Sequence, residues 1–264
     1  MKEKGKKNWL LNIALLICAV AFLGSGLYLI RYYKNAQNSE EAISELLELK
    51  EDAGDDSASG NAIRTNKGKT VQKKYRKLFK KNGDMIGWIT VKGTKIDYPV
   101  MQTPKDNEYY LHRNFDREYD VNGLPFLDAQ CDVEDDESNL MVYGHHMKSG
   151  LMFKHLMDFE SESFYKNHKT VYLDTLFDER EYEVVSAFRS QIYKEDTDAF
   201  KYYEYIGPLT EKRFNTYVKN VKKRSLYDTG ITPEYGDQLL TMVTCAYHTE
   251  EGRFVVVARR KKQA

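Results

Sequence analysis

Three side chains that can carry chemistry, Cys245, His145 and Arg253, each stand at one end of an apolar stretch of the chain. A thiolate is a strong nucleophile, an imidazole can take up and return its proton, and a guanidinium stabilises negative charge on a thiolate or on a carbonyl oxygen under attack. If the strands pair so that these ends meet, the three groups form a site for nucleophilic attack on a carbonyl. The sequence therefore predicts a cysteine nucleophile, Cys245, with His145 as its proton-transfer partner.

Two other interpretations of these residues stay open at this point. A cysteine at a strand end is usually a small buried hydrophobe, and the chain would then be a surface β-domain with an inert Cys245. Cys245, His248, His145 and His146 include a Cys-x-x-His spacing, which occurs among zinc ligands. Adjacent histidines in an extended strand point to opposite faces, which disfavours one ion held by both. We predict no metal and no cofactor.

Cysteine number and net charge exclude several classes of protein. Only three cysteines occur, Cys18, Cys131 and Cys245, too few for a disulfide framework of the small secreted type. A single bridge between Cys131 and Cys245 stays open. The chain carries 40 basic and 40 acidic residues, so its charge indicates no nucleic-acid partner.

The elements that must position the candidate residues are short strands. Eight stretches are rich in Val, Ile, Tyr, Phe or Thr, as strands prefer. They are Met85–Lys92, Lys95–Met101, Leu124–Asp128, Leu140–His145, Thr170–Asp174, Glu181–Ile192, Gln238–Ala246 and Phe254–Arg260. A helix with an apolar stripe is predicted from Thr210 to Ser225, with Thr210 as its N-cap, and a short amphipathic helix leads into the first strand. This pattern predicts a mainly β fold, a barrel or a sandwich.

The N-terminus predicts a membrane anchor. A lysine-rich start, residues 1–8, precedes an uncharged apolar run from Trp9 to Ile30, long enough to cross a bilayer as a helix. The lysines favour a cytoplasmic N-terminus and an extracellular domain. A cleaved signal peptide is the alternative. We predict a basic N-terminus at 1–8, a transmembrane anchor at 9–31, a helical stalk and flexible linker at 32–69, and a catalytic domain at 70–264.

Two motifs together resemble one known family. Tyr143-Gly144-His145-His146, combined with Thr241-Met242-Val243-Thr244-Cys245 and the later Arg253, resembles the sortases, specifically class B. Supporting stretches that also resemble class B are Gly87-Trp88-Ile89, Ile96-Asp97-Tyr98-Pro99-Val100 and Asn107-Glu108-Tyr109-Tyr110-Leu111. The resemblance spans roughly residues 75–260, in the same order.

The resemblance implies a fold and a reaction. The fold would be a closed eight-stranded β-barrel with flanking helices, displayed on a Gram-positive cell surface. The reaction would cleave a C-terminal sorting motif of secreted proteins after its threonine, through a thioacyl-enzyme on Cys245. An amine of a peptidoglycan cross-bridge, or of a lipid-linked precursor, would then receive the protein. His145 would act as general acid and then as base, and Arg253 would stabilise the oxyanion or hold the substrate backbone.

The resemblance also suggests substrate-binding residues and leaves related reactions open. Asn107, Leu111, Tyr143 and Thr244 match positions that line the substrate groove in class B relatives. Release of product to water by a cysteine peptidase, or polymerisation of pilins, would use the same nucleophile. An L,D-transpeptidase is disfavoured, because its Ser-His-Gly-x-x-Cys motif is missing around Cys245.

Overall fold

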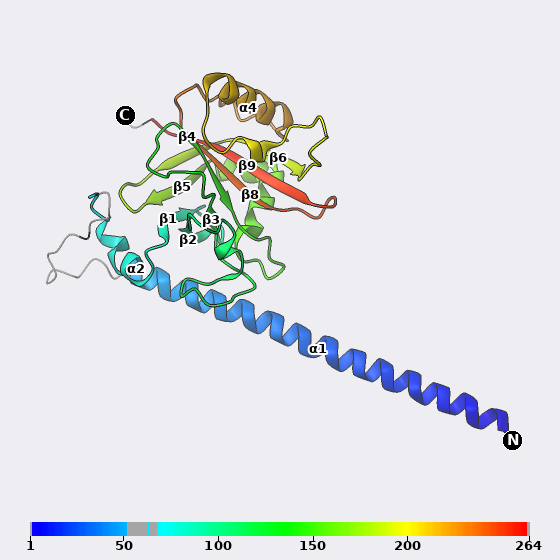
Figure 1. The fold of residues 1–264 in the computed structure, drawn as a ribbon. Coiled ribbons are helices and arrows are strands. Elements are labelled where there is room, and N and C mark those ends of the chain that lie inside the picture. Colours follow the sequence, from blue (N-terminus) through cyan, green and yellow to red (C-terminus); the bar gives the residue numbers. More distant parts are fainter. Residues whose placement is uncertain (1, 52–62, 64–67, 263–264) are drawn as a thin grey trace.

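The computed structural model describes residues 2–51, 63 and 68–262, and its centre is a β-barrel beside a long helix (Figure 1). The strands are β1 (Met85–Thr90), β2 (Asp97–Met101), β3 (Phe126–Leu127), β4 (Ser138–Tyr143), β5 (Thr170–Thr175), β6 (Glu181–Gln191), β7 (Gly207–Pro208), β8 (Leu239–Cys245) and β9 (Gly252–Arg260). The α-helices are α1 (Lys2–Glu51), α2 (Arg76–Lys81), α3 (Glu162–Asn167) and α4 (Glu211–Arg224). The 3-10 helices are η2 (Lys73–Tyr75), η3 (Tyr109–His112), η4 (Phe153–Glu160) and η5 (Tyr202–Glu204).

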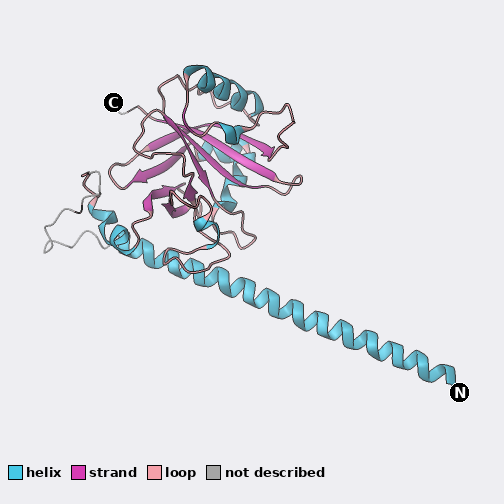
Figure 2. Ribbon diagram, in the orientation of Figure 1, coloured by secondary structure: helices cyan, strands magenta, loops and turns pink. Residues whose placement is uncertain are grey.

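Eight of the strands form a closed ring. Their order is β3-β2-β1-β5-β6-β9-β8-β4, and a further pairing of β3 with β4 joins the two ends. The pairs β4–β8 and β2–β3 are parallel and the others antiparallel. The predicted closed eight-stranded barrel with flanking helices is confirmed (Figure 2). The two-residue strand β7 pairs with β4 outside the ring and was not predicted, because Gly207-Pro208 has no strand-like pattern.

Strands β8 and β9 are buried on both faces. Every residue of β8 before Cys245 is buried, as are the five from Phe254 to Ala258 in β9. Both strands belong to the barrel wall, and η4 packs against them. A strand buried on both faces has an uninterrupted apolar sequence instead of an alternating one. This explains the two apolar stretches that end at the candidate nucleophile and begin beside Arg253.

Helix α4 covers the barrel beside β6, as its apolar stripe predicts. The Thr210 side chain accepts a hydrogen bond from the backbone N–H of Arg213 and caps the helix. Tyr217 and Val221 are buried, and the Val221 carbonyl accepts a hydrogen bond from Ser186 of β6 at 2.7 Å. The predicted helix and its N-cap are confirmed.

Helix α1 is continuous from Lys2 to Glu51, and its two halves have different surroundings. The N-terminal half projects away from the barrel and exposes its apolar side chains, such as Leu16 and Phe22 (Figure 1). The C-terminal half lies along the barrel domain and buries Ala36 and Leu46. Among the described residues, this is the helix that is long and apolar enough to cross a membrane. Most of the linker predicted after it, residues 52–62, lies outside the described residues.

Candidate active site

The register of two strand pairs brings the three candidate residues to one end of the barrel. In the antiparallel pair β8–β9, Cys245 stands directly opposite Arg253. In the parallel pair β4–β8, Tyr143 stands opposite Val243. The Gly144 N–H donates to the Val243 carbonyl at 3.1 Å, so the pairing continues beyond β4 toward His145. Directly opposed residues of neighbouring strands project from the same face of a sheet.

Gly144 permits the close packing that precedes the histidines. A Cβ atom at this position would lie 2.6 Å from the ring of Phe153, which is fully buried. The Phe153 N–H donates to the His145 carbonyl at 2.8 Å and holds the turn from the other side. The Thr244 hydroxyl donates to the Gly144 carbonyl at 2.8 Å. The backbone that presents His145 is therefore tied both to η4 and to the strand that carries Cys245.

The His145 ring is oriented by a backbone carbonyl. Its Nε2 atom lies 2.8 Å from the carbonyl oxygen of Leu111. A carbonyl only accepts hydrogen bonds, so Nε2 carries the proton in this contact and Nδ1 is left to exchange a proton with another group. The ring also stacks on His112 at a centroid distance of 5.3 Å. The contacts therefore fix both the tautomer and the plane of the imidazole.

Burial lowers the pKa of His145 below its usual value near 6.5. The hydrogen bond to the Leu111 carbonyl opposes this shift, the neighbouring His112 adds to it, and the Asp120 carboxylate opposes it weakly. Desolvation disfavours the imidazolium, so the neutral ring predominates near pH 7. A neutral imidazole can accept the proton of a thiol and return it to an amine.

The second histidine, His146, binds the backbone of the nucleophile strand. Its Nδ1–H donates to the Cys245 carbonyl at 2.9 Å, and its ring packs beside Tyr247 at 5.2 Å. Burial lowers the pKa of His146 as well, with the hydrogen bond to Cys245 acting in the opposite direction. His146 therefore holds the end of β8 in place through the main chain, while His145 keeps a free ring nitrogen.

Arg253 presents a partly exposed guanidinium at the same end of the barrel. Its Nη1 donates to the Gly252 carbonyl and its Nη2 to the Glu251 carboxylate, both at 3.0 Å. A guanidinium has five N–H donors, so these contacts leave others for a ligand. Gly252 lets the chain return closely beside β8, because a Cβ there would lie 2.1 Å from the Ala246 carbonyl.

The three cysteines are free thiols and differ in their surroundings. Cys245 is half-buried, whereas Cys131 is buried and its sulfur contacts the Asn139 carbonyl at 3.4 Å. Burial raises the pKa of Cys131 to about 11. The bridge between Cys131 and Cys245 that the sequence left open is not formed, and Cys245 is the thiol with access to solvent in the barrel domain.

The predicted substrate-binding residues fall into two groups. Asn107 and Tyr143 both donate to the Asp128 carboxylate, at 3.0 and 3.2 Å, and Leu111 lies beside His145 as described above. These three belong to one wall next to the catalytic end. Thr244 is 1% exposed and its hydroxyl donates to Gly144, so its side chain supports the backbone that presents His145.

Several residues of this end were not found from the sequence. His112, Asp120 and Asp128 contact or face the predicted residues across loops. The sequence signals for two of them are weak: His112 directly follows the Asn107–Leu111 stretch, and Asp128 begins an acidic stretch that ends at Glu137. Among the described residues, no group of three or more His, Cys, Asp or Glu side chains could hold a metal ion, so the zinc interpretation gains no support.

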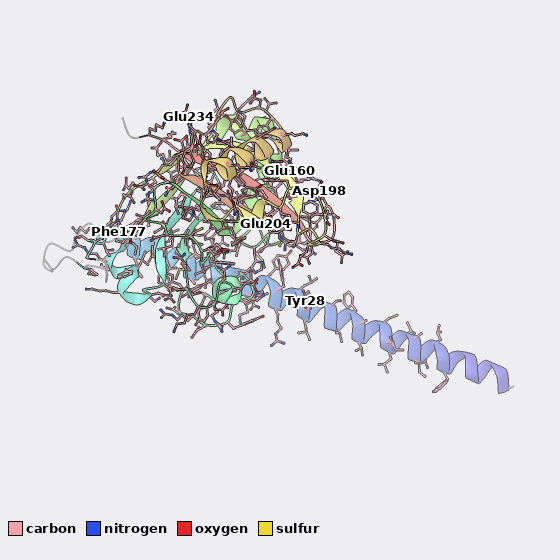
Figure 3. The ribbon with its side chains drawn as sticks, turned by 45° about the horizontal axis from the view of Figure 1, so that its top comes forward. Tyr28, Glu160, Phe177, Asp198, Glu204 and Glu234 are labelled. Atoms are coloured by element: carbon pink, nitrogen blue, oxygen red, sulfur yellow. The ribbon has the colours of Figure 1, made fainter. Side chains whose placement is uncertain are left out.

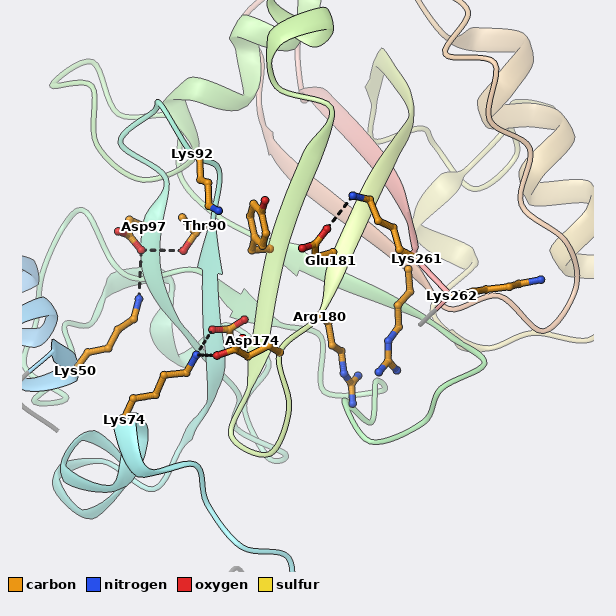
Figure 4. Close-up of a pocket in the computed structure, with 13 residues that line it drawn as sticks. Lys50, Lys74, Thr90, Lys92, Asp97, Asp174, Arg180, Glu181, Lys261 and Lys262 are labelled. Carbon is orange, nitrogen blue, oxygen red and sulfur yellow. Dashed lines mark hydrogen bonds and ion pairs between the residues drawn. The ribbon is translucent and has the colours of Figure 1, made fainter. Parts of the chain in front are cut away.

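A large charged cavity lies elsewhere, over β1, β5, β6 and β9 near the end of α1 (Figure 4). Its volume is about 820 Å³, and none of Cys245, His145 and Arg253 lines it. Its charged groups pair with one another: Lys74 binds Asp174 at 2.7 Å, and Lys261 binds Glu181 at 2.8 Å. These contacts indicate a network that joins the N-terminal segment to the barrel.

Comparison with known proteins agrees with this geometry. Residues 89–261 match the sortase domain family. The chain is 34% identical to sortase B of Listeria monocytogenes over 198 residues, which are 74% of this chain and 77% of that protein. The chain belongs to the class B sortases.

Solved sortase B structures share the fold. The Bacillus anthracis sortase B in complex with AAEK1 has a TM-score of 0.70 and 30% identity, covering 88% of this chain and 100% of that one. A Staphylococcus aureus sortase B–substrate complex has a TM-score of 0.68 and 26% identity, covering 88% and 98%. Sortases of this class are cysteine transpeptidases that anchor proteins to the cell wall, and this chain is such an enzyme.

Proposed function

We propose that this sortase transfers secreted proteins, cleaved after a threonine in a C-terminal sorting motif, to an amine of the cell wall, with Cys245 as nucleophile, His145 as proton carrier and Arg253 as electrostatic clamp. The observation that carries this assignment is the strand register. It places Cys245 opposite Arg253 and continues the β4–β8 pairing toward His145. The half-buried thiol supports it too, because an inert core cysteine would be enclosed as Cys131 is.

The first half of the reaction breaks the peptide bond. The Cys245 thiol gives its proton to the neutral His145 ring as its sulfur attacks the threonine carbonyl, and negative charge develops on the carbonyl oxygen. The C–N bond then breaks, and the leaving amine takes a proton from the imidazolium of His145. A thioester remains on Cys245. The hydrogen bond from Nε2 to the Leu111 carbonyl supports Nδ1 as the nitrogen that carries this proton.

The second half forms the new peptide bond. A wall amine gives its proton to the neutral His145 ring and attacks the thioester carbonyl. The C–S bond breaks, and the Cys245 sulfur takes back the proton from His145, which restores the thiol and the neutral ring for another cycle. The lowered pKa of His145 favours this half, because the neutral ring is the form that accepts a proton.

Arg253 contributes to both halves. Arg253 stands opposite Cys245 in the β8–β9 register, so its guanidinium is placed to donate to the oxyanion that each attack produces. The contact with the exposed Glu251 carboxylate keeps the guanidinium at this end of the barrel, and the remaining N–H groups face no other described carboxylate. Arginine suits this task because its planar fork offers two parallel hydrogen bonds to one substrate.

We also propose that α1 anchors the enzyme in the cell membrane with its N-terminus in the cytoplasm. The exposed apolar half of α1 and the lysine-rich start support this orientation. The active-site wall next to Leu111, formed by Asn107, Tyr143 and the Asp128 that both contact, would receive the sorting motif.

Peptide-library cleavage with and without an added amine tests the proposal. Wild-type enzyme is expected to cleave one class of peptide after threonine and to form the amide of the added amine. Cys245→Ala and His145→Ala are expected to do neither, while each variant still unfolds in urea in one cooperative transition. Turnover by either variant would refute the assigned roles, and cleavage without amide formation would make the enzyme a peptidase.

A further inference from the structure

The membrane-anchor helix reaches the loop that carries the catalytic histidine. Tyr32 of α1 follows directly after the apolar run, and its hydroxyl accepts a hydrogen bond from the Ser149 backbone N–H at 3.2 Å. Ser149 belongs to the loop from Gly144 to Met152, which presents His145. The Tyr32 ring is half-buried, whereas Tyr28, one turn earlier, is 69% exposed (Figure 3). The domain contact thus begins where the apolar run ends.

The same helix also holds a second loop that faces the histidine. The Ser39 hydroxyl donates to the Asp120 carboxylate at 2.6 Å and accepts a hydrogen bond from the Asn122 side chain at 2.8 Å. The Asp120 N–H donates to the His112 carbonyl at 3.1 Å. His112 is the residue on which His145 stacks. Ser39 is therefore linked to the stacking partner of the imidazole through one carboxylate.

The two contacts come from one face of α1. Tyr32, Ala36 and Ser39 are spaced by four and three residues, which places them in one stripe along a helix. Ala36, between the two hydrogen-bonding residues, is 8% exposed and lets the helix approach the loops closely. This stripe, Tyr32–Ala36–Ser39, spans both loops that surround His145. Neither hydroxyl is needed for helix formation or for crossing the membrane.

We propose that the Tyr32–Ala36–Ser39 stripe of the anchor helix positions His145. The membrane anchor would then contribute to the rate of catalysis as well as to attachment. The inference rests on the proposed function, because it assumes that His145 moves the proton. Tyr32 and Ser39 act as positioning residues: they touch loop backbone and the Asp120 carboxylate, and no reacting atom. Proton transfer depends steeply on geometry, so loosening this support lowers the rate of the chemical step.

The proposal predicts different effects on kcat and on the KM for the peptide. The sorting motif would bind along the wall near Asn107 and Tyr143, which the stripe does not contact. Losing a stripe hydroxyl should therefore lower kcat and leave KM for the peptide nearly unchanged. Loss of one supporting hydrogen bond is expected to reduce kcat about three- to tenfold.

The test uses full-length enzyme in lipid vesicles, with turnover of a sorting-motif peptide as the readout. Tyr32→Phe and Ser39→Ala remove one hydroxyl each, and Ser39→Thr restores the hydroxyl. The matched controls are Tyr28→Phe and Ser44→Ala, two exposed positions of the same helix. We expect a lower kcat for the first two variants, and near wild-type values for Ser39→Thr and both controls. Urea unfolding of each variant corrects the rates for the folded fraction.

The pH profile of kcat/KM gives a readout that a merely structural contact would not change. His112 and Asp120 are the titratable groups that face His145 from the neighbouring loop and from η3. The Asp120 carboxylate favours the imidazolium, so releasing it in Ser39→Ala should shift the acidic limb of the profile to lower pH. Ser44→Ala should keep the wild-type limb.

The outcomes distinguish this inference from the proposed function. If Cys245→Ala and His145→Ala are inactive while Tyr32→Phe and Ser39→Ala keep the wild-type kcat and acidic limb, the stripe has no positioning role. A rise in KM without a change in kcat would also overturn it, because the stripe would then act on substrate binding. Turnover by His145→Ala would instead refute the proposed function itself.

Discussion

Polar side chains have different partners at the proposed catalytic end of the barrel and in the charged cavity over β1, β5, β6 and β9. In the cavity, basic side chains form ion pairs with carboxylates, as Lys74 does with Asp174 and Glu179. At the catalytic end, His145 and His146 meet backbone carbonyls. A carbonyl fixes the direction of a ring without neutralising a charge, and it leaves the second ring nitrogen free. These contacts indicate a structural ion-pair network in the cavity, whereas the proposed active site keeps ring nitrogens free for proton transfer.

The largest effect in this comparison should come from the nucleophile. We expect Cys245→Ala to reduce turnover of a sorting-motif peptide by roughly 1,000-fold or more, because no other exposed thiol of the barrel domain stands opposite Arg253. Steady-state cleavage assays measure the loss. Cys131→Ala is the matched control, since it removes a buried thiol far from solvent, and it should retain kcat while losing some stability. A fully active Cys245→Ala enzyme would contradict the assignment of the Cys245 end of the barrel as the reactive region and of the charged cavity as the structural one.

The next largest effect concerns the guanidinium. Arg253→Lys keeps the positive charge but removes the planar fork, and we expect kcat/KM to fall roughly 100-fold. The control is Arg189→Lys on β6, an exposed arginine whose guanidinium forms a bidentate pair with the half-buried Glu160, and we expect this variant to keep the wild-type kcat/KM. Equal activity of the two variants would mean that Arg253 acts only through its charge, as the cations of the cavity do.

The sequence indicates the proposed catalytic residues but not the groups that hold them in place, for a physical reason. Cys245, His145 and Arg253 each stand at one end of an uninterrupted apolar stretch, and this local pattern can be recognised from the sequence alone. The acceptor for His145 is the carbonyl of Leu111, a group that every residue possesses, so no residue type could reveal it. The contact of Ser39 with Asp120 joins positions far apart in the chain and is equally invisible in the sequence.

The strand period adds a constraint on Thr244, which the resemblance assigned to the substrate groove. Successive residues of a strand point to opposite faces, so the residue before an accessible Cys245 should point inward. The structure buries Thr244, which stands opposite Phe254 in the β8–β9 pair. The barrel closure through β3 and β4 was likewise available only from the resemblance, because strands of two and six residues do not specify their partners.

A smaller effect is expected in the cavity. Lys74→Ala removes two ion pairs at a partly exposed position and should lower the free energy of unfolding by about 1 kcal/mol, since screening by water limits such pairs. Peptide turnover should not change once corrected for the folded fraction. Lys166→Ala, which breaks an exposed pair with Glu162 on α3, is the control and should cost less. A loss of turnover in Lys74→Ala would show that the cavity contributes to catalysis.

The smallest effect is a change in how stability depends on pH. Burial lowers the pKa of His145 in the folded state, so the unfolded chain binds its proton more readily. The stabilisation is complete above the unfolded-state pKa of about 6.5 and is lost as the pH falls through the lower folded-state pKa. Urea unfolding at pH 7.5 and 5.5 should therefore show a smaller difference for His145→Gln than for the wild type. The control is His248→Gln at an exposed position, which should keep the wild-type difference. If His145→Gln shows the same difference in stability between the two pH values as the wild type, the His145 ring is solvated in the folded enzyme. The contact with the Leu111 carbonyl would then not shield the ring from water, and the contrast with the charged cavity would be lost.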